Sequence, residues 1–122
     1  LIYLSLLTGE KVDSMRAVIR SRRQATPENV YLRFLEAFAL HQQGSHFEAA
    51  GLLIPLPQHR WHQGEAAVVA SIIASAGKID RSSALIQQID PAQLLPEEHT
   101  LFDPWSNRVA LGTGLIGSIG TK

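Results

Sequence analysis

The sequence predicts an all-α fold, an α-α solenoid in which antiparallel helix pairs form a right-handed superhelix of about two and a half to three units. Three observations predict it. Apolar residues recur at helical spacing in successive segments. Gly9, Gly44 and Gly77 follow three of these segments at intervals of 35 and 33 residues, a period typical of helical repeats. Glycine readily adopts the left-handed conformation just past a helix end, so each turn is short and its two helices pack as a hairpin.

The first unit is expected to begin inside a helix. The apolar run from Leu1 to Leu7 precedes Gly9 and lacks the basic leader of a signal peptide. It is also far too short to cross a bilayer. We therefore expect it to be the end of a helix that belongs to a longer chain. The helix that follows carries an inward-facing apolar stripe made of Val12, Met15, Val18 and Ile19.

The middle unit has a start signal and a stop signal. Thr26 offers a hydroxyl cap, and Pro27 suits the first helical position, so we expect a helix over Pro27–Gln43. Its partner helix is expected over 45–54, where two nearby prolines prevent it from continuing.

The third unit repeats this plan with smaller side chains. Helices are expected over Glu65–Ala76 and Arg81–Ile89. A fourth unit starts at Pro96 but meets Pro104 early. We therefore predict a repeat domain over residues 1–103 and a glycine-rich, irregular tail over 104–122.

Small and large apolar residues recur at matching places around two of the glycines. They are Ala37, Leu40, Gly44, Ala49 and Leu53 in the middle unit, and Ala70, Ile73, Gly77, Ser82 and Ile86 in the next. This framework resembles the tetratricopeptide-repeat (TPR) family from Leu1 to Pro91. Arg33 and Glu36 replace large apolar residues of the family pattern, and Ser82 replaces an alanine. Related two-helix repeats such as HEAT-like units stay open as an alternative.

The resemblance implies a protein-binding scaffold whose first helices line a concave face that takes a peptide or a partner subunit. The candidate groove residues are Tyr31, Phe34, Phe38, His41 and Gln42, with Ser71 and Ser75 from the next unit. The first five form one stripe of a helix. The alternative is that Phe34 and Phe38 belong to the core, because aromatic stripes at helical spacing usually do. Tyr31 and His41, near the ends of the stripe, are then the better groove candidates.

Arg16, Arg20 and Arg23 share one face of a helix and form a second candidate site, for a phosphate or an acidic partner. The alternative is a solvated face whose cations complement the helix dipole. Eleven basic residues balance eleven acidic ones, and no aromatic residues interleave with the arginines. The sequence therefore argues against nucleic acid as a partner.

No catalytic or metal-binding motif is recognisable. The chain has no cysteine, and its histidines offer only the pairs His41/His46 and His59/His62, too few ligands for a zinc site. The sequence thus predicts no enzyme, metal or cofactor in this chain. No signal or transmembrane segment is recognisable either, which argues against a membrane partner and slightly favours the cytoplasm.

One motif supports an enzymatic alternative. Residues 112–117 read GxGxxG, and Arg108–Leu111 before them is a candidate strand, as at the opening of a dinucleotide-binding Rossmann unit. The chain would then be the helical regulatory domain of a larger nucleotide- or cofactor-dependent enzyme whose Rossmann-like domain begins near residue 108. The five residues after Gly117 leave no room for that domain here. A third hypothesis is self-association through exposed solenoid ends.

Overall fold

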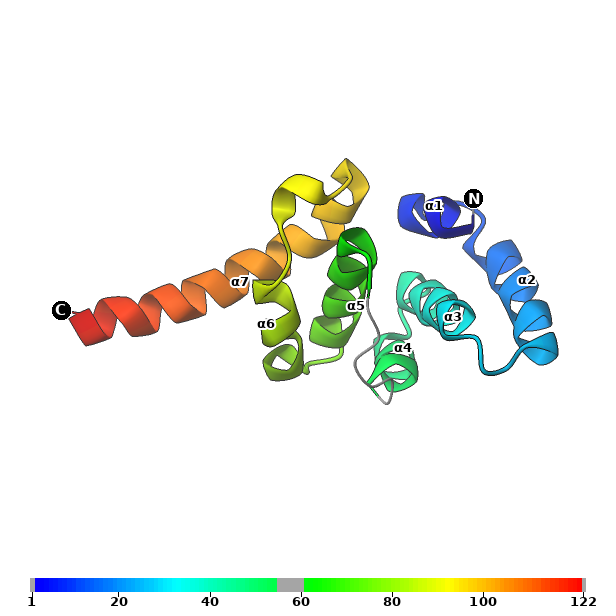
Figure 1. Ribbon diagram of the computed structural model, residues 1–122, viewed down its shortest axis with the longest axis horizontal. Coiled ribbons are helices and arrows are strands. Elements are labelled where there is room, and N and C mark those ends of the chain that lie inside the picture. Colours follow the sequence, from blue (N-terminus) through cyan, green and yellow to red (C-terminus); the bar gives the residue numbers. More distant parts are fainter. Residues whose placement is uncertain (1, 55–60, 122) are drawn as a thin grey trace.

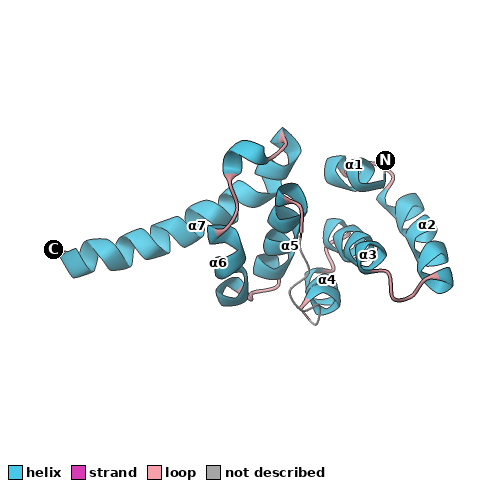
Figure 2. Ribbon diagram, viewed as in Figure 1, coloured by secondary structure: helices cyan, strands magenta, loops and turns pink. Residues whose placement is uncertain are grey.

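The chain is all-helical in its computed structural model, which describes residues 2–54 and 61–121, with side chains up to Arg108 (Figure 1). This part of the chain contains no strand (Figure 2). A short 3-10 turn, Pro91–Gln93, lies between the last two helices. The helices are α1 (Ile2–Thr8), α2 (Val12–Ala25), α3 (Val30–Gln42), α4 (His46–Leu53), α5 (Gln63–Ser75), α6 (Ile79–Gln87) and α7 (Pro96–Thr121).

The three glycine turns have the same geometry. Gly9, Gly44 and Gly77 have φ angles of 78°, 89° and 83°, which only glycine adopts freely. In each turn the residue after the glycine donates its N–H to a carbonyl five residues earlier, the bond that defines a Schellman motif. These bonds are Glu10 to Ser5 (3.0 Å), Ser45 to Leu40 (2.9 Å) and Lys78 to Ile73 (3.2 Å). The predicted helix ends are therefore confirmed at all three glycines.

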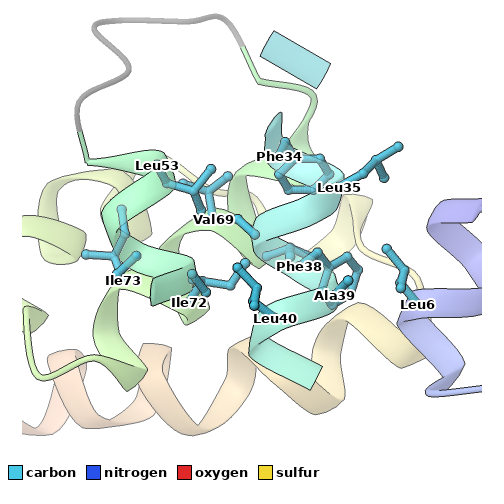
Figure 3. Packing of buried hydrophobic residues seen from close by; sticks show 14 of the residues in the cluster. Leu6, Phe34, Leu35, Phe38, Ala39, Leu40, Leu53, Val69, Ile72 and Ile73 are labelled. Atoms are coloured by element: carbon cyan, nitrogen blue, oxygen red, sulfur yellow. The ribbon is translucent and has the colours of Figure 1, made fainter. Parts of the chain in front are cut away.

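Each glycine turn joins two helices that pack against each other, as expected: α1 with α2, α3 with α4, and α5 with α6. The odd-numbered helices also pack in succession, α1 on α3, α3 on α5 and α5 on α7. In addition, α1 contacts α7. The main core lies between these helices, where Leu6, Phe38 and Ile72 meet from α1, α3 and α5 (Figure 3).

Helix α5 is the most deeply buried element. Every residue from Ala66 to Ala74 is buried, as expected of a helix that is apolar on all sides and enclosed by its neighbours. One side of it contributes to the main core. The other side carries alanines that form a second core with Ile86, Ile89, Leu94 and Phe102. This second core fixes α7 against the third hairpin.

The residues that depart from the TPR pattern have local partners. Arg33 donates its Nε to the Leu52 carbonyl at 2.7 Å, in the last turn of α4, where carbonyls lack a helical partner. Glu36 accepts a hydrogen bond from Arg23 of α2. Ser82 is buried and donates its hydroxyl to the Ile79 carbonyl at 2.9 Å. At these three positions a polar side chain therefore takes the place of an apolar one, and a neighbouring group provides its hydrogen-bond partner.

Three details of the predicted helices differ from the structure. Helix α6 covers Ile79–Gln87 rather than Arg81–Ile89. Helix α3 begins at Val30 rather than Pro27, because Asn29 provides the cap: its side-chain oxygen accepts the Leu32 N–H at 3.0 Å. Residues 26–29 form a turn instead. Val18, expected on the inward stripe, is exposed. Ile19 is the buried residue of α2, with Val12 and Met15 packed at the edge of the core.

Where the sequence predicts an irregular tail, the structure has a helix: α7 continues through Pro104 to Thr121. Pro104 removes one helical hydrogen bond, but Phe102 and Trp105 on either side of it pack on the second core. The glycines beyond it each lower helix stability by about 1 kcal/mol without forbidding a helix. Residues 108–111, the candidate strand of the enzymatic alternative, lie within this helix. In the part of the chain that the structure describes, this helix takes the place of the strand and turn with which a dinucleotide-binding unit opens.

Candidate binding surface

The seven predicted groove residues do not form one exposed surface. Phe34 and Phe38 are fully buried, in agreement with the alternative interpretation of the stripe as core. Tyr3 of α1 covers them, with ring centroids 6.0 and 5.7 Å away. Trp61 lies 5.2 Å from Phe34 on the α5 side. A ligand cannot reach these rings while α1 and α5 are in place.

The glutamine and serine side chains of the predicted groove form hydrogen bonds with backbone carbonyls of the helices. Gln42 donates to the Leu6 carbonyl at 2.6 Å and so ties α3 to α1. Ser71 is buried and donates to Ala67, while Ser75 is half-buried and donates to Ser71, at 2.7 and 2.8 Å. Both serine hydroxyls are thus hydrogen-bonded to backbone carbonyls of α5 itself. Only Tyr31, 43% exposed, keeps a side chain open to a partner.

His41, one of the two favoured groove residues, is also buried. Its side chain is only 8% exposed, and its Nδ1 lies 3.0 Å from Nδ1 of His46. One of these nitrogens must carry the hydrogen and the other accept it. Burial, and then the neighbouring His46, lower the pKa of His41 to about 4. The pair therefore joins the two helices of the middle hairpin around Gly44.

Three arginines do share a face, as predicted, and this face of α2 lies beside α3. Arg16 donates to the side-chain oxygen of Gln43 at 2.8 Å. Arg23 pairs with Glu36 of α3, and Arg20 lies 3.9 Å from the same carboxylate. The Arg20 side chain is 63% exposed. We call Arg16, Arg20, Arg23, Gln24 and Gln43 the basic face.

Two depressions flank Arg20 on the basic face. One has a volume of about 460 Å³ and is lined by Asp13, Arg16, Ala17, Arg20, Ser21, Gln24 and Gln43. The other, of about 480 Å³, is lined by Arg20, Arg23, Gln24, Pro27 and Glu36. These volumes fall in the range of small ligand sites. Arg20 and Gln24 border both depressions, so they separate two adjoining hollows that an extended segment would cross.

Sequence reasoning missed the contribution of α3 to this surface. Glu36 stood out only because it departed from the repeat pattern, and Gln43 carried no signal at all. Gln43 bridges two charges of α2, since it accepts from Arg16 and donates to Asp13 at 2.5 Å. These contacts join residues about 30 positions apart, so helical periodicity within one segment does not reveal them.

No metal centre is found where the structure describes the chain: no three histidine or acidic side chains gather there. His59, half of the second histidine pair, lies outside the described residues. None of the described helices combines the length and apolar character needed to cross a membrane. The chain matches no protein-family model, no curated protein and no solved structure with which it was compared.

Proposed function

We propose that this chain is a TPR-like interaction module that binds an acidic segment of a partner protein along the basic face. One observation carries the proposal: Arg20 is highly exposed between two depressions that are lined mainly by arginine and glutamine. An acidic segment lying over Arg20 would place side chains in both hollows.

The charge balance of the basic face favours an acidic ligand. Four arginines lie between positions 16 and 23, and the carboxylates that line the depressions are Asp13 and Glu36. Glu36 is already engaged by Arg23. Within the described residues, Arg16 and Arg22 have no carboxylate within salt-bridge distance. The basic face therefore carries more positive than negative charge. Guanidinium groups bind carboxylates with two parallel hydrogen bonds.

The fold supports a binding role more than a catalytic one. Three hairpins with the same glycine turn, 35 and 33 residues apart, are what a short TPR-like superhelix requires. Stacked hairpins of this kind offer long surfaces that bind extended partners. The deep aromatic stripe stabilises the stack, which leaves recognition to exposed faces. Self-association through the ends of the stack stays a separate prediction.

The proposal is tested with a fluorescein-labelled peptide of six glutamates and fluorescence anisotropy. Arg20→Glu is expected to weaken binding by about three- to tenfold, since an exposed ion pair contributes roughly 0.2–1 kcal/mol and charge reversal adds repulsion. Arg81→Glu is the matched control, because Arg81 is an exposed arginine on α6 with the same change in net charge. Equal weakening by both variants would show a response to net charge alone and contradict the proposal.

A further inference from the structure

The first turns of the odd-numbered helices meet at a second exposed surface. Tyr3 of α1 and Tyr31 of α3 both contact Phe34, with ring centroids 6.0 and 5.9 Å from it. Tyr3 also donates a hydrogen bond to Glu98 in the first turn of α7. Gly64 at the start of α5 lies against the Glu98 carboxylate, so the first turn of α5, which carries Glu65, lies beside these residues. Burial raises the pKa of both tyrosines most; the charge of Glu65 raises both further, and for Tyr3 its effect ranks after those of Glu98. We call Tyr3, Tyr31, Glu65 and Glu98 the aromatic-acid rim.

The rim is open enough to receive a ligand. Tyr31 is 43% exposed, and Tyr3 and Glu65 are half-buried. Glu98, in contrast, is only 4% exposed. The rim therefore offers an accessible aromatic face and one accessible carboxylate, backed by a second carboxylate that is fixed in place.

The two carboxylates of the rim have neutral partners. Glu65 accepts the His62 backbone N–H at 3.1 Å. Glu98 accepts the Leu95 N–H at 2.7 Å as well as the Tyr3 hydroxyl. Neither carboxylate forms an ion pair with any residue that the structure describes. The rim thus combines two acidic groups with aromatic rings and contains no cation of its own.

We propose that the aromatic-acid rim binds a lysine or arginine side chain from a basic segment of a partner. The cation would lie against the exposed Tyr31 ring and pair with Glu65. Aromatic faces attract cations through their quadrupole, and a carboxylate without an ion-pair partner adds direct attraction at short range. Charge complementarity therefore selects a basic segment over an apolar one. This site has the opposite charge preference to the basic face and shares no residue with it.

A fluorescein-labelled tetralysine peptide, followed by fluorescence anisotropy at low salt, tests this site on the full chain. Tyr31→Ala and Glu65→Gln are each expected to weaken binding about two- to fivefold, the effect of one exposed cation-aromatic contact or ion pair. Tyr31→Phe keeps the ring and is expected to bind like the wild type. Glu65→Gln keeps an oxygen that can accept the His62 N–H, so the start of α5 is preserved.

The matched controls are Phe47→Ala and Glu97→Gln. Phe47 is an exposed aromatic residue on α4, and Glu97 is an exposed acid next to Glu98, so both variants repeat the chemical change away from the proposed contacts. Equal losses in Glu97→Gln and Glu65→Gln would overturn the proposal, as would unchanged binding in Tyr31→Ala. Circular dichroism reports folding, and Tyr31→Leu replaces Tyr31→Ala if alanine lowers the helix content. Binding of hexaglutamate at the basic face is expected to be unchanged in these variants.

Discussion

Replacing Gly64 with alanine is expected to destabilise the protein, although alanine is the better helix former. Gly64 is the second residue of α5 and lies directly under the Glu98 carboxylate. A Cβ atom at this position would be 2.6 Å from the carboxyl carbon of Glu98, closer than real Cβ atoms come to their neighbours. Glu98 cannot withdraw easily, because it accepts hydrogen bonds from Tyr3 and from the Leu95 N–H.

The magnitude follows from two opposing effects. Alanine in place of glycine in a helix interior contributes about 0.5–1 kcal/mol, and less in the first turn. Moving Glu98 sacrifices hydrogen bonds to a buried charged group, each worth about 1.5–3 kcal/mol. We therefore expect Gly64→Ala to lower the free energy of unfolding by about 1–2 kcal/mol, within the usual range for overpacking. A Cβ atom added to Gly51 on α4 would meet no neighbouring group within 4 Å, so Gly51→Ala is expected to raise stability by up to about 1 kcal/mol.

Urea denaturation followed by circular dichroism measures both variants against the wild type. A double-mutant cycle with Glu98→Ala isolates the contact, since the penalty of Gly64→Ala should disappear once the carboxylate is removed. If Gly64→Ala is as stable as Gly51→Ala, or if its penalty persists without Glu98, then α7 does not pack on α5 in the way described.

Three further predictions concern pH, turns and caps. Burial lowers the pKa of His41 to about 4 from its usual 6.5. The stability that the buried, uncharged His41 side chain contributes is therefore complete above pH 6.5 and is lost as the pH falls towards 4. Urea denaturation at pH 7.5 and 4.5 measures the free energy of unfolding, and its decrease at the lower pH should be about 2–3 kcal/mol larger in the wild type than in His41→Gln. An equal decrease in both proteins would contradict this. Gly44→Ala should cost about 1–2 kcal/mol in the same assay because φ is 89°, and an unchanged midpoint would argue against the left-handed turn. Asn29→Ala should lower the free energy of unfolding by about 0.5–2 kcal/mol, and Thr26→Ala should lower it less. A larger effect of Thr26→Ala would indicate that the helix begins at Pro27, as the sequence predicts.

The helical plan could be predicted from the sequence because its signals are local. A glycine that ends a helix acts through its own φ angle and through bonds within five residues. Gly9, Gly44 and Gly77 therefore marked the turns correctly. A helix start is harder to predict where two residues could each cap it. Asn29, not Thr26, caps α3 because its side chain accepts the Leu32 N–H.

The candidate groove could not be predicted in the same way. Helical spacing shows that Phe34 and Phe38 share a face, but it does not show what covers that face. Tyr3 covers it from α1, more than 30 positions away. The same limit explains the tail, since the contacts of Phe102 with α5 that support α7 across Pro104 are also distant in sequence. Arg16, Arg20 and Arg23 were found correctly as a shared face because their relation is confined to one helix.

The basic face of α2 and α3 is proposed to bind an acidic segment of a partner protein. An NMR titration of the ¹⁵N-labelled chain with unlabelled hexaglutamate tests it most directly, because each amide reports binding at its own position. We predict saturable shifts concentrated on the backbone around Arg16, Arg20, Gln24 and Gln43, with little change around Arg81. Shifts that are spread evenly over basic residues, or that concentrate on α5 and α6, would contradict the proposal.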